Sequence, residues 1–201
     1  MKKQSYKTID KEFLNEIDKI KGSRFIGIAT PVKTEEDLKN ELYKIKKRYY
    51  DARHHCYACI LGNKDKIIKY SDDGEPSKTA GLPIYTVLNS YDVTDILVVV
   101  IRYFGGTKLG TGGLVKAYTK ATQELLEKVS FTEIEIKESI IFKFSYDLTK
   151  QIYHVINLYE GVIKNETYEN DVTFEIELNI SFTEDFKRDL IEKTDGKVKM
   201  E

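Results

Sequence analysis

Residues 95–104 read D-I-L-V-V-V-I-R-Y-F, an almost uninterrupted run of β-branched, aliphatic and aromatic side chains. A run of this length and composition predicts a strand that is buried on both faces of a sheet. No apolar stretch near 18 residues occurs in the chain, which excludes a membrane-spanning helix. The chain therefore folds around a covered sheet.

The segments before this strand predict a mixed order of strands and helices. Residues 23–32 predict a strand, and 53–61 predict a second strand that turns at 62–65 into a hairpin. Between them, Thr34 and Asp37 predict a reciprocal helix cap. The apolar residues of that helix recur at helical spacing and are Leu38, Leu42, Ile45 and Tyr49.

Two further helices are predicted in the first 130 residues. Ser77 predicts the cap of a helix that runs to about Leu88, although Gly81 and Pro83 weaken that helix. A longer helix is predicted from about Gly113 to Lys128. Its apolar face consists of Leu114, Tyr118, Ala121 and Leu125.

Residues 131–201 predict the order βαββα(β), the split βαβ or ferredoxin-like arrangement. The first strand alternates with Ile134, Ile136, Ile140, Phe142 and Phe144 on one face. Asp147 predicts a helix cap and Gly161 predicts the end of that helix, whose apolar stripe is Leu148, Ile152, Val155, Ile156 and Tyr159. A strand near 162–169, an alternating strand over 172–182, a helix from Thr183 and an edge strand at V-K-M follow.

A net charge of −1 conceals two parts of opposite charge. Residues 1–130 hold 23 basic and 17 acidic side chains, whereas residues 131–201 hold 9 and 16. We therefore predict a two-domain α+β protein, with domains 1–130 and 131–201, whose first domain attracts an anion such as RNA or a phosphate group. Attraction between the two domains is the alternative explanation. The N-terminus lacks a secretory signal, and two cysteines cannot form a disulfide framework, so a cytoplasmic location is predicted.

The H-H-C-Y-A-C run at 54–59 suggests zinc or redox chemistry, but strand geometry opposes it. Alternation places His54 and Cys56 on one face and His55 and Cys59 on the other. Four ligands from this run cannot surround one ion, and no helix start follows Cys59 to lower a thiol pKa. We predict buried cysteines, no metal and no cofactor. The histidines remain open as acid, base or phosphate contacts, or as packing residues.

Residues 102–113, R-Y-F-G-G-T-K-L-G-T-G-G, place five glycines between the buried strand and a helix start. Glycines let the backbone approach a ligand, and a helix start presents unpaired N–H groups, so this segment resembles an anion cradle. It matches neither a Walker A motif nor G-x-G-x-x-G. A tight connection that needs glycines for packing is the alternative.

The acidic segment at 71–81, S-D-D-G-E-P-S-K-T-A-G, carries three carboxylates that could bind Mg²⁺ or serve as acid and base, or simply form a surface turn. Lys78 and Thr79 at the following helix start are candidate phosphate contacts. The complete set of predicted anion- or RNA-binding residues is Arg53, His54, Lys78, Thr79, Arg102, Gly105, Gly106, Lys108, Gly110, Gly112, Gly113 and Lys116.

Three ordered blocks, A-R-H-H-C-Y-A-C-I-L-G, S-D-D-G-E-P-S-K-T-A-G-L-P-I and V-V-V-I-R-Y-F-G-G-T-K-L-G-T-G-G-L-V-K-A-Y, resemble the signature blocks of the YigZ/IMPACT family, in its bacterial YigZ-type two-domain form. Lys78 departs from the small residue usual in that pattern. The resemblance implies an N-terminal α+β domain of the type shared by elongation factor G and a ribosomal protein. It also implies a C-terminal domain similar to the last domain of elongation factor G.

The resemblance implies a translation or nucleic-acid context but no reaction, so no catalytic residue is assigned. The leading hypothesis is a regulatory or binding protein that contacts RNA or the ribosome through the basic domain. An enzyme acting on a phosphorylated small molecule or nucleotide is the second hypothesis. A protein-interaction module that docks through the acidic domain is the third.

Overall fold

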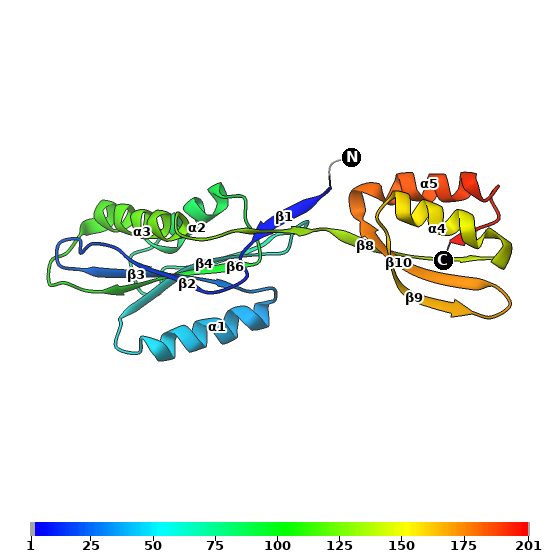
Figure 1. Cartoon of the computed structure of the whole chain (residues 1–201). Helices are drawn as coiled ribbons and strands as arrows, with labels where there is room; N and C mark the ends of the chain where they lie inside the picture. The colour runs from blue at the N-terminus through cyan, green and yellow to red at the C-terminus, as the bar shows by residue number, and fades with distance from the viewer. Residues whose placement is uncertain (1–2, 201) are drawn as a thin grey trace. The chain divides into compact units, whose positions relative to one another are not determined.

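The chain folds into two compact units, each with its own sheet and core (Figure 1). The computed structural model describes residues 3–200. The N-terminal unit comprises residues 6–133, and the C-terminal unit comprises residues 134–200 together with residues 3–5. Both units contain helices and strands, which confirms the predicted two-domain α+β class.

The N-terminal unit is built on a five-stranded antiparallel sheet with the strand order β2-β3-β6-β4-β5. Its strands are β2 (Phe13–Glu16), β3 (Arg24–Pro31), β4 (His54–Leu61), β5 (Ile67–Ser71) and β6 (Ile96–Tyr103). A separate two-stranded sheet pairs β1 (Ser5–Thr8) with β7 (Thr132–Glu135). The predicted strands and the hairpin β4–β5 are confirmed.

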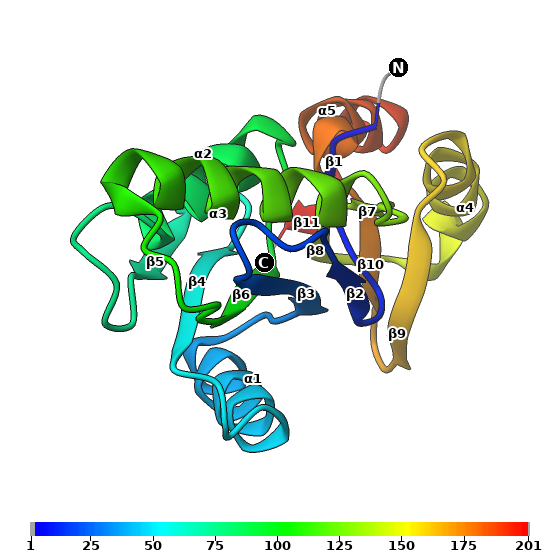
Figure 2. The ribbon, with the colours of Figure 1, turned by 90° about the vertical axis from the view of Figure 1, so that its left-hand side faces the viewer.

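Strand β6 is buried on both faces, as its apolar run predicts. Helices α2 (Gly81–Ser90) and α3 (Gly110–Leu126) cover one face of the sheet, and α1 (Glu35–Arg48) covers the other, as Figures 1 and 2 show. Val98 and Val100 belong to the core beneath α2 and α3, whereas Val99 and Ile101 belong to the core beneath α1. Two cores therefore share one sheet.

The start of α1 is the capping box predicted from the sequence. The Asp37 N–H donates to Thr34 Oγ1 over 3.0 Å, and the Thr34 N–H donates to Asp37 Oδ2 over 2.9 Å. Leu38 and Ile45 are buried under the sheet. The local sequence alone is sufficient for this element because every partner lies within four residues.

The other two helices of this unit begin elsewhere than predicted. Helix α2 begins at Gly81 instead of at Ser77, which is exposed and lies outside the helix. Its first N–H groups are bound by the distant Asp72. Helix α3 begins at Gly110, one turn before the predicted Gly113. Gly110, Gly112 and Gly113 therefore belong to the first turn of the helix, whereas Gly105 and Gly106 lie in the loop before it.

The C-terminal unit has the predicted order βαββα(β). Its elements are β8 (Lys137–Phe144), α4 (Thr149–Leu158), β9 (Val162–Tyr168), β10 (Val172–Asn179), α5 (Thr183–Lys193) and β11 (Lys199–Met200). The strand order is β11-β8-β10-β9, with antiparallel neighbours, and α4 and α5 cover one face (Figure 1). Phe142 pairs with Phe174 and Ile140 with Ile176, which places the alternating apolar faces of β8 and β10 in one core.

Two of the predicted alternating strands are shorter than their sequence patterns: the one that becomes β8 starts later, and the one that becomes β10 ends earlier. Ile134 and Ile136 do not join the core, because the segment divides into β7 and β8, and the Ile136 N–H donates to the Gln4 carbonyl. At the other end, β10 stops at Asn179, whose side-chain oxygen accepts the Ser181 N–H at the start of a 3₁₀ turn. Short turns therefore interrupt two patterns that look continuous in the sequence.

Two helix ends in the C-terminal unit also differ from prediction. Asp147 does not cap α4, because it lies inside a 3₁₀ turn (Tyr146–Leu148) and its carboxylate accepts a hydrogen bond from the Ser145 hydroxyl. At the end of α4 the left-handed residue is Glu160, with φ of +55°. The Gly161 N–H then donates to the Ile156 carbonyl over 2.9 Å, so Gly161 contributes to closing the helix.

Candidate functional site

A buried ion pair connects the acidic loop to the central strand of the N-terminal unit. The Arg102 Nη1 donates to Glu75 Oε1 over 2.7 Å, and both side chains are only a few per cent exposed. Strand β6 holds Arg102 on the α2 and α3 side of the sheet, and the loop after β5 carries Glu75 over it. Arg102 Nη2 also donates to Ser23 Oγ over 3.3 Å, while Arg102 Nε lacks a partner among the described residues.

Three further side chains, Tyr118, Cys56 and His54, complete this arrangement, and together with Glu75 and Arg102 they form what we call the Glu75 network. The Tyr118 hydroxyl donates to Glu75 Oε1 over 2.9 Å, and Cys56 Sγ lies 3.3 Å from that hydroxyl. His54 Nδ1 donates to the Asp73 carbonyl, which leaves Nε2 4.0 Å from Glu75 Oε1. Burial raises the pKa of the Tyr118 hydroxyl and raises the pKa of the Cys56 thiol to about 12, so both stay protonated.

Asp72 binds the start of α2 from outside the helix. One carboxylate oxygen accepts the N–H groups of Ala80 and Gly81, each over 2.9 Å, and the other accepts the Lys78 N–H over 2.8 Å. A carboxylate satisfies unpaired N–H groups at a helix start and is stabilised by the helix dipole. The protein therefore supplies the anion at this helix start itself.

We expect Asp72→Ala to lower the free energy of unfolding by about 2 kcal/mol, because three N–H groups lose their acceptor. Urea denaturation followed by circular dichroism measures this. Ser77→Ala is the matched control and is expected to change stability by less than about 0.5 kcal/mol, because Ser77 is exposed and caps nothing. Equal losses for the two variants would contradict the role of Asp72.

Asp73 fixes the same loop to β4 and α1. Its carboxylate accepts the His55 N–H over 2.7 Å and pairs with Lys46 Nζ over 3.0 Å. Burial favours a raised pKa for Asp73, but these two contacts outweigh burial and lower it. His55 is itself buried, donates from Nε2 to the Tyr49 carbonyl, and has a pKa lowered by burial. All three carboxylates of the loop are thus engaged with groups of the protein.

The glycine loop, residues 105–113, lies directly after β6. The Gly105 N–H donates to Ser23 Oγ over 3.2 Å, so one serine hydroxyl accepts from both Arg102 and the loop. Gly106 and Gly110 have left-handed φ angles of +88° and +72°. A Cβ added at Gly106, Gly110 or Gly112 would point into open space. The segment is therefore packed at Gly105, tight against Leu109 at Gly113, and open at the three glycines between them.

The start of α3 contrasts with the start of α2. Its N-cap residue is Leu109, and no side chain caps the first turn. Gly110 and Gly112 are exposed, and so are Lys108, two residues before the helix begins, and Lys116, in its second turn. Neither lysine forms an ion pair within residues 3–200. An uncapped helix start with adjacent cations is the geometry that accommodates a phosphate.

The predicted site residues divide into exposed and buried groups. The exposed side chains are Arg53, Lys78, Lys108 and Lys116, and His54 is partly buried. Arg102 and Thr79 do not lie on the exposed face: Arg102 is paired with Glu75, and the buried Thr79 hydroxyl donates to the Pro76 carbonyl over 2.6 Å. These two residues shape the face from beneath and cannot contact a ligand there without rearrangement.

Sequence reasoning missed Ser23, Tyr118 and the capping role of Asp72. Tyr118 was assigned to an apolar helix face, and its burial agrees with that, but its hydroxyl also bonds to Glu75. Asp72 precedes the N–H groups it binds by up to nine residues, a spacing for which no local motif exists. An aspartate before a helix that lacks a cap of its own is the signal that was available.

The C-terminal unit, which contains no part of the Glu75 network, has concavities of its own on its surface. One of about 480 Å³ lies along α4 and α5 and is lined by Asp147, Lys150, Gln151, His154 and Lys193. Its lining mixes charges of both signs. Within residues 3–200, no group of three or more His, Cys, Asp or Glu side chains is arranged to hold a metal ion. None of the helices over those residues has the length and apolar character needed to span a membrane.

Comparison with known proteins matches the two compact units of the chain to two separate family domains. Residues 21–126 match the Impact N-terminal domain, and residues 142–197 match a domain of unknown function, DUF1949. The IMPACT family member YvyE of Bacillus subtilis is 36% identical over 193 residues, which cover 96% of this chain and 88% of YvyE. YigZ of Escherichia coli is 31% identical over 186 residues, which cover 92% of this chain and 91% of YigZ.

A solved structure described as a crystal structure of an hypothetical protein superposes with a TM-score of 0.70 at 29% identity, covering 100% of this chain and 97% of the other. The fold and the matched segments define a two-domain protein that joins an Impact N-terminal domain to a second α+β domain. The chain belongs to the IMPACT family, as its three sequence blocks predict.

Proposed function

We propose that this protein is a translation-associated regulatory or binding protein that contacts RNA or the ribosome through the glycine-loop face of domain 1–130. Membership of the IMPACT family and the positive charge of that domain support the proposal. A cytoplasmic location is part of it. The acidic domain 131–201 is proposed to be ferredoxin-like, on the strength of its βαββαβ order and its strand order.

One observation carries the proposal. Of the two neighbouring helix starts, that of α2 is filled by the Asp72 carboxylate, whereas that of α3 has no side-chain cap. Backbone N–H groups at an open helix start bind phosphate without selecting a sequence. Exposed Lys108 precedes this helix start by two residues, and exposed Lys116 adds positive charge in the second turn. The contacts we propose are therefore these lysines, Arg53, Lys78 and the backbone of the glycine loop.

Phosphoryl chemistry at this face has less support. That hypothesis needs carboxylates that can hold Mg²⁺ or move a proton. Asp72 binds the start of α2, Asp73 binds His55 and Lys46, and Glu75 binds Arg102 and Tyr118. The binding function is therefore the one that the arrangement favours.

We expect Lys108→Glu/Lys116→Glu to weaken binding to RNA at least about tenfold at low salt. Removing two phosphate contacts is also expected to reduce the slope of log affinity against log salt by about 1.4 for single-stranded RNA. The measurement compares tRNA, ribosomes and a generic RNA at two salt concentrations. Preference for one of them over the generic RNA would show specificity.

Lys150→Glu/Lys193→Glu is the matched control, because it makes the same charge change at exposed lysines of the C-terminal unit. The control is expected to bind RNA as the unmodified chain does. If both double variants bind equally, the glycine loop is not the RNA contact. Absence of binding at low salt by the unmodified protein would refute the proposal itself.

A further inference from the structure

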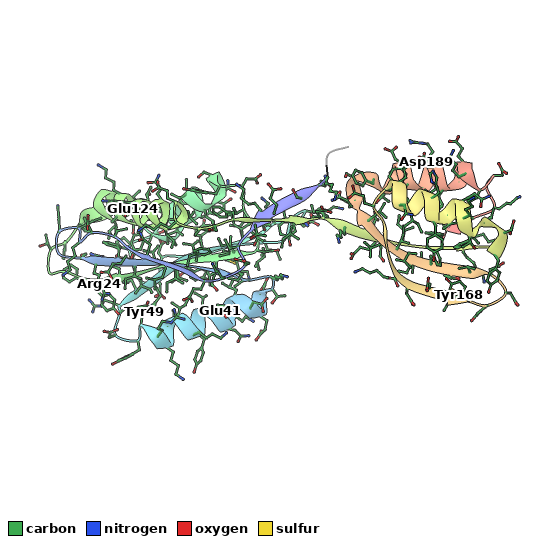
Figure 3. All side chains as sticks on the ribbon, in the orientation of Figure 1. Arg24, Glu41, Tyr49, Glu124, Tyr168 and Asp189 are labelled. Atoms are coloured by element: carbon green, nitrogen blue, oxygen red, sulfur yellow. The ribbon has the colours of Figure 1, made fainter. Side chains whose placement is uncertain are left out.

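Two exposed tyrosines lie on the side of the sheet covered by α1: Tyr43 is on the helix, and Tyr50 is in the turn just after its end. Tyr43 is 68% exposed and Tyr50 is 85% exposed. Figure 3 shows the side chains of α1 projecting away from the sheet. The apolar face of the helix is already formed by Leu38 and Ile45, so the core does not require these two rings.

Basic side chains neighbour Tyr43 along α1, and Tyr50 lies between this basic segment and Asp51. Residues 42–50 contain four basic side chains and no acidic one. Lys39, Lys46 and Lys47 lie one helical turn from Tyr43, at spacings that make side chains neighbours on a helix. We call the α1 basic surface the following exposed residues: Lys39, Tyr43, Lys44, Lys46, Lys47 and Tyr50.

The helix dipole accounts for cations in the last turn of α1 but not for exposed aromatic rings beside them. A tyrosine ring offers a flat face on which a nucleic-acid base stacks, and the neighbouring lysines neutralise the phosphates. An alternation of rings and cations along one surface is how proteins bind single strands without reading their sequence. The positive charge and the flat aromatic rings of this surface therefore both favour a single-stranded nucleic acid as the partner.

The ion pairs already present do not prevent such binding. Lys39 pairs with Glu36 over 4.0 Å, Lys44 with Glu41 over 2.7 Å and Lys46 with Asp73 over 3.0 Å, and each lysine is about half exposed or more. The Lys39–Glu36 pair is exposed on both sides and contributes little to stability, so a phosphate can replace that carboxylate, whereas Lys46 stays paired with the mostly buried Asp73. Lys47 forms no ion pair among the described residues.

We propose that the α1 basic surface binds single-stranded nucleic acid, with bases stacked on Tyr43 and Tyr50 and phosphates on the adjacent lysines. This surface goes beyond the proposed function, because α1 covers the face of the sheet opposite α2 and α3. A strand bound here has no need of the glycine loop.

The chain has no tryptophan, which makes a direct test of stacking possible. Tyr43→Trp introduces a single tryptophan, and a stacked base is expected to quench its fluorescence. Titration with single-stranded oligo(U) and oligo(dT) should give saturable quenching, and duplex RNA, whose bases are already stacked, should give little. Adding Tyr50→Ala should weaken oligo(U) binding at least about fivefold.

Tyr146→Trp is the matched control, since Tyr146 is 51% exposed in the acidic C-terminal unit and should show no quenching. Lack of quenching of Tyr43→Trp by oligo(U) at low salt would overturn the proposal. An equal response to poly-glutamate would also overturn it, in favour of an acidic protein partner. Combining Tyr43→Trp with Lys108→Glu/Lys116→Glu should leave the quenching intact, so failure of the glycine-loop proposal is distinguishable from failure of this one.

Discussion

Glu75→Ala is expected to lower the free energy of unfolding of the N-terminal unit by about 3–5 kcal/mol. The substitution leaves the Arg102 guanidinium buried without its carboxylate, and an uncompensated charge in the interior is strongly destabilising. The Tyr118 hydroxyl loses its acceptor at the same time. Urea denaturation followed by circular dichroism provides the measurement.

Two further variants make this expectation specific to the buried pair. Glu12→Ala breaks the pair with Arg48, at 2.7 Å but largely exposed, and should lose less than about 1 kcal/mol. Glu75→Gln/Arg102→Met removes both charges and should recover much of the loss, because the penalty comes from the unpaired charge. If Glu75→Ala loses no more than Glu12→Ala, the pair does not stabilise the unit.

Gly105→Ala is expected to be the most damaging change of a single methyl group in the glycine loop. A Cβ at this position would lie 1.8 Å from the Gly22 carbonyl carbon, so two backbone segments would have to separate. Overpacking of this kind destabilises by about 1–3 kcal/mol or more. The separation also breaks the hydrogen bond from the Gly105 N–H to Ser23. Thermal and urea unfolding measure the loss.

Gly112→Ala provides the control within the same segment. No atom lies within 4 Å of the added Cβ, and the residue is in the first turn of α3. We expect unchanged stability or a gain of up to about 1 kcal/mol, since alanine favours the helix more than glycine does. Equal destabilisation by the two variants would mean that conformational freedom, rather than close packing, requires glycine at position 105.

The sequence predicted those elements whose causes are local. The apolar run of β6 and the capping box of Thr34 and Asp37 were both found as predicted. The start of α2 could not be predicted, because its first N–H groups are bound by Asp72. This residue lies at the beginning of the loop between β5 and α2, and the loop folds back to place it at the helix start. The same limit applies to β7 and β8, which read as one strand and belong to two sheets.

The candidate site was predictable in its exposed part. Lys108, Lys116 and the glycines follow from spacing alone, and Lys108, Gly110, Gly112 and Gly113 lie at an uncapped helix start. The burial of Arg102 depends on Glu75, which is 27 residues away in the chain. Charge alone does not distinguish an arginine that contacts a ligand from one that forms an internal pair, so Arg102 was assigned to the surface.

The strand order of the N-terminal sheet determines when this unit can fold during synthesis. Strands β2 and β3 form one ribbon and β4 and β5 form another, and neither pairs with the other directly. Strand β6, which joins them, is made last, after residue 95. Until β6 emerges, strands β3 and β4 lack the strand that pairs with both of them. Their unpaired edges and apolar side chains are then exposed, which favours aggregation. The growing chain therefore carries an open sheet for much of its first hundred residues. Insertion of β6 completes the sheet, and the core beneath α2 and α3 closes only when α3 has also been made.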